Sequence, residues 1–258
     1  MNSSRNLWRV LASVSVIGTI VLVISFAYAI RIVVFPQGGV IEESNNSPNP
    51  VQDNANLQIV ALGDSITVGF GDTTGKGYVK NLQELLSEEQ NQPVYVVGNF
   101  AQNGYTTAQV LADLNERNGI QQAVKSADII LLTAGGNDLF RLGDEIDVKA
   151  FQDKIPATQA ILQNIFQKIN ELNPDLTIYY VGLYNPFIEA VEIEGTSLAV
   201  QAWNNAAFQA AEAYDNIVIV PSYDLFEQKM GDFLSSDNYH LNDAGYLKIA
   251  KRLAMLIE

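Results

Sequence analysis

Five short apolar runs, rich in β-branched residues, recur along the chain after residue 56. They cover residues 57–62, 94–99, 128–134, 177–183 and 216–221. A continuous apolar run of this length is typical of a strand that is buried on both faces of a sheet. The pattern therefore predicts five parallel strands.

Longer segments with a helical spacing of apolar residues separate and follow these runs. They cover residues 77–90, 106–116, 150–172, 198–214 and 242–257. Strands that alternate with helices predict right-handed βαβ units, and hence an α/β domain with helices on both faces of the sheet. Ligands of such domains bind at the carboxyl ends of the strands, so functional residues are expected directly after each strand.

The N-terminal segment, residues 1–35, has the composition of a membrane helix. The stretch from Val10 to Ile30 carries no charge and, at about 1.5 Å per helical residue, is long enough to cross a hydrocarbon core of about 30 Å. Arg5 and Arg9 precede this stretch, while Arg31 and then Glu42 and Glu43 follow it. The positive-inside rule thus predicts that the chain beyond the segment is exported.

The same segment contains a possible cleavage site for signal peptidase. Ala27, Tyr28 and Ala29 form an AxA pattern, and cleavage there would release the protein. However, no polar spacer precedes the pattern, and Ile32 to Phe35 continue the apolar run beyond it. The sequence therefore favours a retained anchor, with secretion after cleavage as the alternative.

The remaining chain divides into a linker and one domain. Residues 36–56 are rich in Asn, Pro and Gly, which predicts a flexible linker. Residues 57–258 show uniform composition and no internal repeat, so a single domain is expected. The net charge of −14 argues against nucleic acid as a partner. The absence of cysteine excludes disulfides, a thiolate nucleophile and zinc sites built on sulfur.

Polar residues with catalytic potential follow three of the predicted strands. Ser65 lies two residues beyond the first strand, in "GDSITVGFG". Gly104 follows the second strand in "NFAQNGYTT", and Asn137 follows the third in "TAGGNDLF". Each residue alone is typical of a helix cap or a turn. Together they place a hydroxyl and several hydrogen-bond donors at one edge of the sheet.

His240 is the only histidine of the chain and lies between the last strand and the last helix, in "SSDNYHLND". Asp237 precedes it by three residues. Across a turn, this separation lets the carboxylate reach one ring nitrogen while the other faces the crevice. The placement favours a catalytic base over an ordinary surface histidine.

Two other functions are weaker interpretations of the same loops. The stretch "GFGDTTGKG" is rich in glycine, but its spacing is wrong for a phosphate-binding loop, and Gly77 stands where Ser or Thr is needed. Asp64 and Asp138 could form the carboxylate pair of a glycosidase. Because Asp at such turns usually accepts hydrogen bonds from the backbone, structural roles are favoured for both.

The blocks "GDSITVG", "NFAQNGYT", "GGND" and "DNYH" resemble, in order and placement, the four blocks of the SGNH hydrolase superfamily, also called the GDSL lipase/esterase family. The resemblance covers nearly all of residues 57–257, and "GLYNPF" is similar to a bacterial membrane-tethered subset. Ala101 departs from the second block, which often carries Gly or Ser there. The resemblance implies a flavodoxin-like, three-layer α/β/α fold with a five-stranded parallel sheet.

The resemblance also implies the chemistry of the site. Ser65 would be the nucleophile, His240 the base and Asp237 its orienting carboxylate, with Ser65, Gly104 and Asn137 forming the oxyanion hole. This set implies hydrolysis of a small-molecule, lipid or acylated-glycan ester through an acyl-serine intermediate, without metal or cofactor. Acyl transfer to a sugar hydroxyl would use the same residues. A catalytically silent binding module is a further alternative, although the complete set of polar residues argues against it.

The walls of the site are expected in two segments, 139–150 and 184–198, which follow the third and fourth strands. Their mixture of apolar and acidic residues suits an acyl chain with a neutral head group better than an anionic substrate. The alternative is that both segments are ordinary solvated loops.

Overall fold

The computed structural model of the chain describes Thr19 and residues 56–89, 93–140, 146–189 and 194–257. The predicted membrane segment, 1–35, and the predicted linker, 36–56, lie outside the described residues except for Thr19 and Asn56, so both remain predictions. Within the described ranges, no helix has the length and hydropathy needed to span a bilayer.

The sheet has five parallel strands in the order β2-β1-β3-β4-β5. The strands are β1 (Leu57–Leu62), β2 (Val94–Asn99), β3 (Ile129–Leu132), β4 (Thr177–Val181) and β5 (Ile217–Val220). Every strand lies within its predicted range, and the last three are shorter than expected. The predicted α/β fold with a five-stranded parallel sheet is confirmed.

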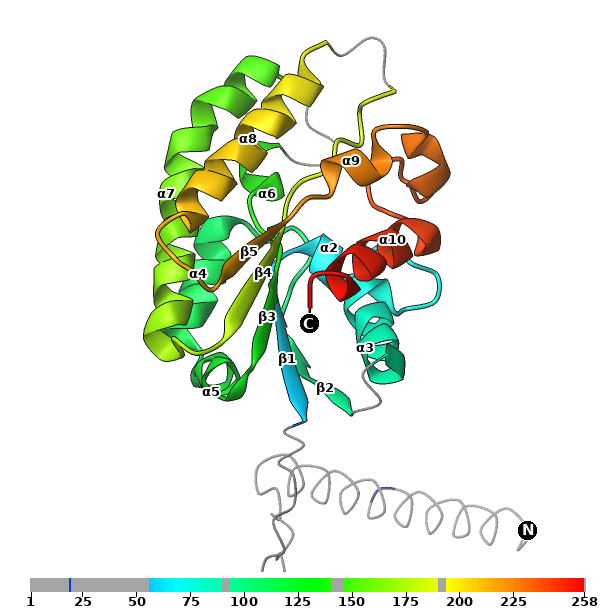
Figure 1. Cartoon of the computed structure of the whole chain (residues 1–258). Helices are drawn as coiled ribbons and strands as arrows, with labels where there is room; N and C mark the ends of the chain where they lie inside the picture. Colours follow the sequence, from blue (N-terminus) through cyan, green and yellow to red (C-terminus); the bar gives the residue numbers. More distant parts are fainter. Residues whose placement is uncertain (1–18, 20–55, 90–92, 141–145, 190–193, 258) are drawn as a thin grey trace, which may run out of the picture. The chain divides into compact units, whose positions relative to one another are not determined.

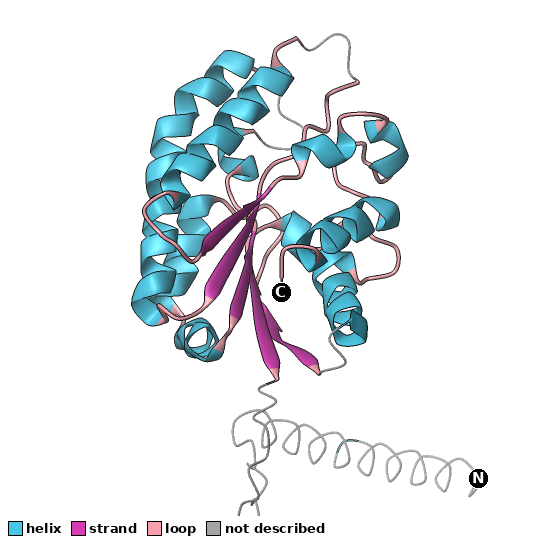
Figure 2. Cartoon of the chain, in the orientation of Figure 1, coloured by secondary structure: helices cyan, strands magenta, loops and turns pink. Residues whose placement is uncertain are grey.

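Helices cover both faces of the sheet and make three layers (Figure 1, Figure 2). One face is covered by α3 (Gly77–Glu89) and α10 (Asp243–Ala254). The other is covered by α4 (Thr107–Glu116), α5 (Asn118–Ser126), α7 (Val148–Leu172) and α8 (Thr196–Ala211). These long helices correspond to the predicted ones, apart from α5.

Strand β1 shows why the apolar runs are continuous. Ile59 and Ala61 point into the core beneath α3 and α10, whereas Val60 and Leu62 point into the core on the opposite face. All four side chains are buried. Burial of a large aliphatic side chain contributes about 1.5–3 kcal/mol, so both faces of the strand require apolar residues.

Five short elements were not predicted from the sequence. They are α2 (Ser65–Val68), α5, α6 (Gly136–Leu139), α9 (Tyr223–Phe226) and the 3-10 helix η1 (Met230–Phe233). In α5, which is separated from α4 by Arg117 alone, the buried apolar side chains are Ile120, Ala123 and Val124. Helices of fewer than about 12 residues are marginal in isolation, so tertiary packing rather than local pattern decides where they form.

The strand order fixes the location of the crevice. From β1 the chain passes to β2 on one side, and from β2 it crosses back to β3 on the other side of β1. Such a reversal opens a crevice outside the carboxyl ends of the neighbouring strands β1 and β3. Helix α2 directly follows β1 and α6 follows β3, and both lie at this end of the sheet in Figure 1.

Candidate active site

Ser65 is held by a tight turn between β1 and α2. Gly63 has a φ of 135°, which favours glycine, and a Cβ at this position would overlap the carbonyl oxygen of Thr133. The Oδ1 atom of Asp64 then accepts a hydrogen bond from the Ile66 N–H at 3.0 Å and caps α2. The turn therefore presents Ser65, the first residue of α2, at the carboxyl end of β1.

Ser65, His240 and Asp237 form a continuous hydrogen-bonded chain. The Oγ atom of Ser65 lies 2.8 Å from Nε2 of His240, and Nδ1 of His240 lies 2.6 Å from Oδ2 of Asp237. An ionised carboxylate can only accept, so Nδ1 carries the ring proton and Nε2 is left to accept the serine proton. The three residues thus have the relative positions of nucleophile, base and orienting carboxylate.

Asp237 is bound on both of its oxygens. While Oδ2 faces the imidazole, Oδ1 accepts hydrogen bonds from the Ser235 hydroxyl at 2.8 Å and from the backbone N–H groups of Tyr239 and His240 at 3.0 and 2.9 Å. Partial burial raises the pKa of Asp237, but the hydrogen bond from the His240 imidazole, together with those on Oδ1, outweighs the burial and lowers the pKa to about 2. The carboxylate is therefore charged at neutral pH and keeps its orientation.

The segment that carries the base and the carboxylate folds as a small hairpin. Leu234 and Leu241 form an antiparallel bridge, and the Ser235 N–H donates to the His240 carbonyl oxygen at 2.8 Å. Asn238, at the tip, has a φ of 54°, a left-handed conformation that asparagine tolerates better than most residues. The hairpin brings Asp237 and His240 together through local contacts.

Gly104 and Asn137 line the same cleft as Ser65 and His240. Gly104 has a φ of 75°, so its conformation favours glycine, although a Cβ there would meet no other atom within 4 Å. The Nδ2 atom of Asn137 donates one hydrogen to the Tyr105 carbonyl oxygen at 2.9 Å. An amide nitrogen has two hydrogens, and the second can serve a ligand in the cleft.

Asp138 fastens the loop that carries Gly104. Its carboxylate accepts hydrogen bonds from the Thr107 backbone N–H at 2.8 Å and from the Thr107 hydroxyl at 2.7 Å. Two consecutive residues, Asn137 and Asp138, thereby hold Tyr105 and Thr107, on the carboxyl side of Gly104. This contact fixes the two donor positions relative to each other, in line with the structural role favoured for Asp138.

Asp64 ends a buried chain of hydroxyl groups that sequence reasoning missed. The Thr133 hydroxyl donates to Asp64 at 2.8 Å, the Thr67 and Thr133 hydroxyls are 2.8 Å apart, and the Tyr78 hydroxyl lies 2.6 Å from that of Thr67. With Asp64 ionised, the donors run in one direction, from Tyr78 toward the carboxylate. Burial raises the pKa of Asp64. The one available signal was Thr133, a hydroxyl residue directly after the apolar run of β3.

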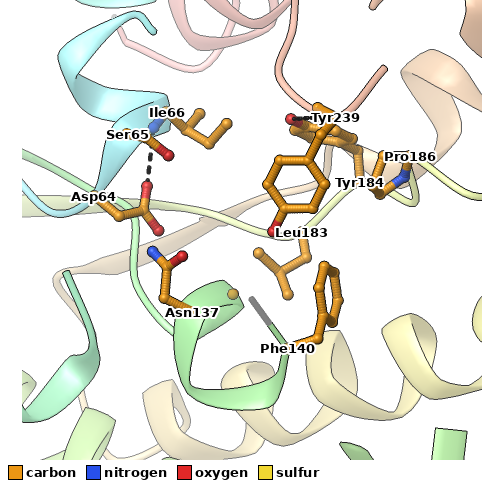
Figure 3. Close-up of a pocket in the computed structure, with 10 residues that line it drawn as sticks. Asp64, Ser65, Ile66, Asn137, Phe140, Leu183, Tyr184, Pro186 and Tyr239 are labelled. Carbon is orange, nitrogen blue, oxygen red and sulfur yellow. Dashed lines mark hydrogen bonds between the residues drawn. The ribbon is translucent and has the colours of Figure 1, made fainter. Parts of the chain in front are cut away.

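Two cavities adjoin Ser65. A narrow pocket of about 30 Å³ lies between Ser65 and Asn137 on one side and Leu183, Tyr239 and Phe140 on the other (Figure 3). An open cleft of about 480 Å³ lies on the side of His240 and Gly104.

The predicted wall segments contribute Phe140, Tyr184 and Pro186 to the narrow pocket. Residues 141–145 and 190–193 of these segments lie outside the described residues. Sequence reasoning missed Leu183 and Tyr239, and also Phe70, which lines the open cleft with its ring centroid 4.6 Å from that of His240. Across the described ranges, no group of three or more His, Cys, Asp or Glu residues is placed to hold a metal ion.

The site lies in a region that matches known proteins. Residues 61–248 match the GDSL-like lipase/acylhydrolase family. The chain is 31% identical over 226 residues to the protein YpmR of Bacillus subtilis (strain 168), covering 84% of this chain and 87% of that protein. It is 31% identical over 206 residues to the spore germination lipase LipC of Bacillus licheniformis, covering 76% of this chain and 94% of the lipase.

A solved structure agrees with these matches. The lipase Lip_vut3 from a goat rumen metagenome has a TM-score of 0.69 and 30% identity, covering 78% of this chain and 97% of that one. The family match runs from β1 into α10 and includes all four sequence blocks. Together with the lipases among its relatives, this match identifies a hydrolase, and the chain belongs to the GDSL-like lipase/acylhydrolase family.

Proposed function

We propose that this protein is an extracytoplasmic serine esterase that hydrolyses carboxylic esters through an acyl-serine intermediate. The observation that carries the proposal is the hydrogen-bonded chain from Ser65 through His240 to Asp237, with distances of 2.8 and 2.6 Å. A serine hydroxyl is a weak nucleophile at neutral pH and needs a base within hydrogen-bond reach.

In the acylation step, Oγ of Ser65 attacks the ester carbonyl carbon while Nε2 of His240 takes the serine proton. Asp237 stabilises the imidazolium that forms. Negative charge develops on the carbonyl oxygen and is received by the backbone N–H groups of Ser65 and Gly104 and by the Asn137 amide. The intermediate then collapses, the bond to the alcohol oxygen breaks, and His240 delivers its proton to the departing alcohol.

Deacylation repeats these steps with water in place of the alcohol. His240 takes a proton from the water molecule, whose oxygen attacks the acyl carbon. The bond to Oγ breaks, and the proton returns to Ser65 while the carboxylic acid leaves. The chain of residues is then ready for another ester.

An active-site label tests the proposal directly. The full chain is incubated with a fluorophosphonate, digested and analysed by mass spectrometry, while hydrolysis of p-nitrophenyl butyrate is followed in parallel. We expect one label per chain, on Ser65, and a loss of activity proportional to labelling.

The matched control is Ser126→Ala, which removes an exposed serine at the opposite end of the sheet, before β3. This variant should be labelled and inhibited like the wild type. Activity that survives complete labelling, or a label on another serine, would contradict the proposed nucleophile.

We propose further that segment 1–35 anchors the domain to the outer face of the cell membrane. Because the chain has no cysteine, Ala213→Cys in the exposed turn after α8 introduces a unique thiol. A membrane-impermeant maleimide should label this variant in intact cells. Labelling only after lysis would contradict export, and a mature N-terminus at Ile30 would indicate cleavage instead of anchoring.

A further inference from the structure

The position of His240 distinguishes the two cavities beside Ser65. The base must deliver a proton to the departing alcohol, so the alcohol oxygen has to lie on the side that the imidazole faces. His240 lines the open cleft and does not line the narrow pocket. The alcohol part of an ester therefore occupies the open cleft, and the acyl part extends into the narrow pocket.

The narrow pocket is small and mostly apolar. Its volume of about 30 Å³ compares with about 10–15 Å³ for the smallest cavity that holds one water molecule. The far wall consists of Phe140, Leu183, Pro186 and the ring of Tyr239 (Figure 3). Such a pocket has room for an acyl chain of about two to four carbons.

A separate apolar cavity of about 10 Å³ adjoins Phe140 and does not touch Ser65. It is lined mainly by side chains of α7, α8 and the segment before α8, among them Val148, Phe151, Phe187 and Val200. Of the described residues, Phe140 alone lines both this cavity and the narrow pocket. Its ring stacks on Phe151 with centroids 5.5 Å apart, and meets Tyr239 edge-on at 5.8 Å.

We propose that Phe140 is the residue that limits the length of the acyl group, and that the preferred substrates are esters of short acyl chains with a bulkier alcohol part. This inference rests on the proposed function and adds the acyl class to it. Removal of the Phe140 ring joins the narrow pocket and the separate apolar cavity into one apolar channel that starts beside Ser65. A longer acyl chain then buries its end among the side chains of α7 and α8 instead of against the Phe140 ring.

The test is a series of p-nitrophenyl esters from acetate to decanoate, hydrolysed by the full chain, by Phe140→Ala and by Phe140→Leu. For the wild type, kcat/KM should fall at least about 10-fold between butyrate and octanoate, since one methylene group in a pocket already changes it about 10-fold or more. Phe140→Ala should raise the octanoate-to-butyrate ratio at least about 10-fold. Phe140→Leu should raise it less, and it decides the outcome if the alanine variant does not fold.

The matched control is Phe70→Ala, the same substitution on the alcohol side of Ser65. Whatever its effect on turnover, this variant should keep the wild-type octanoate-to-butyrate ratio of kcat/KM. A wild type that hydrolyses octanoate as fast as butyrate would overturn the inference, as would folded Phe140 variants with an unchanged ratio. In both cases hydrolysis and labelling of Ser65 persist, whereas failure of the proposed function removes hydrolysis of every ester in the series.

Discussion

Ser65→Ala and His240→Ala should each lower kcat for ester hydrolysis on the order of 10⁶-fold, and the double variant should lose no more than either single variant. The reason is the 2.8 Å contact between Oγ and Nε2. Without the base the hydroxyl keeps its proton, and without the hydroxyl the base has no nucleophile to activate. The chain contains no second histidine that could replace His240.

Steady-state hydrolysis of p-nitrophenyl butyrate measures this effect, with circular dichroism to verify that each variant is folded. The variants should still hydrolyse the ester about 10³–10⁴-fold faster than the uncatalysed reaction in water, because the oxyanion donors and substrate binding are intact. Ser126→Ala again serves as the control and should retain full activity. If the losses of the two single variants multiplied in the double variant, the two side chains would be acting independently and the proposed pairing would be wrong.

Asp237→Asn should lower kcat about 10⁴-fold while leaving the fold intact. The Oδ1 atom of asparagine can still accept the three hydrogen bonds from Ser235, Tyr239 and the His240 backbone. The amide nitrogen then takes the place of Oδ2 and donates to Nδ1. The ring proton has to move to Nε2, which becomes a donor and can no longer accept the serine proton.

The matched control is Asp232→Asn, an exposed aspartate five residues earlier that should keep wild-type kcat. Stability gives an independent measurement. The pKa of Asp237 is lowered to about 2 in the folded state, from 3.8 in the unfolded chain, so its charge stabilises the fold above about pH 4. This contribution disappears as the pH falls from about 4 toward 2. Equal kcat for Asp237→Asn and the wild type would contradict the orienting role.

Much of the fold could be predicted because its strands are buried on both faces. The run at β3 is apolar at every position and the run at β1 is apolar except for Gln58, a pattern that a half-exposed strand would not show. Alternation with long helices then restricted the topology to parallel βαβ units. Helix α5 escaped prediction because its nine residues carry too few apolar positions to stand out from a loop.

The residues of the candidate site that lie just beyond a strand could be predicted from the sequence. Ser65, Gly104 and Asn137 each lie just beyond a strand, and the structure brings all three to one cleft with His240. The part that could not be predicted depends on pairs of side chains far apart in the sequence. Phe140 lines two cavities at once through its contacts with Phe151 and Tyr239, and no local pattern encodes such a contact.

The hairpin that carries Asp237 and His240 makes one contact of the site local in sequence and leaves the other dependent on tertiary packing. The carboxylate and the base meet within three residues, whereas the base and Ser65 are separated by 175 positions. Helix α10 begins at Asp243, just after the hairpin, and packs on α3. The placement of His240 against Ser65 therefore depends on the local opening free energy of this C-terminal unit, which can lie below that of the whole domain. A molecule with an undocked α10 is expected to keep its carboxylate–imidazole pair and to lose the contact of the imidazole with Ser65.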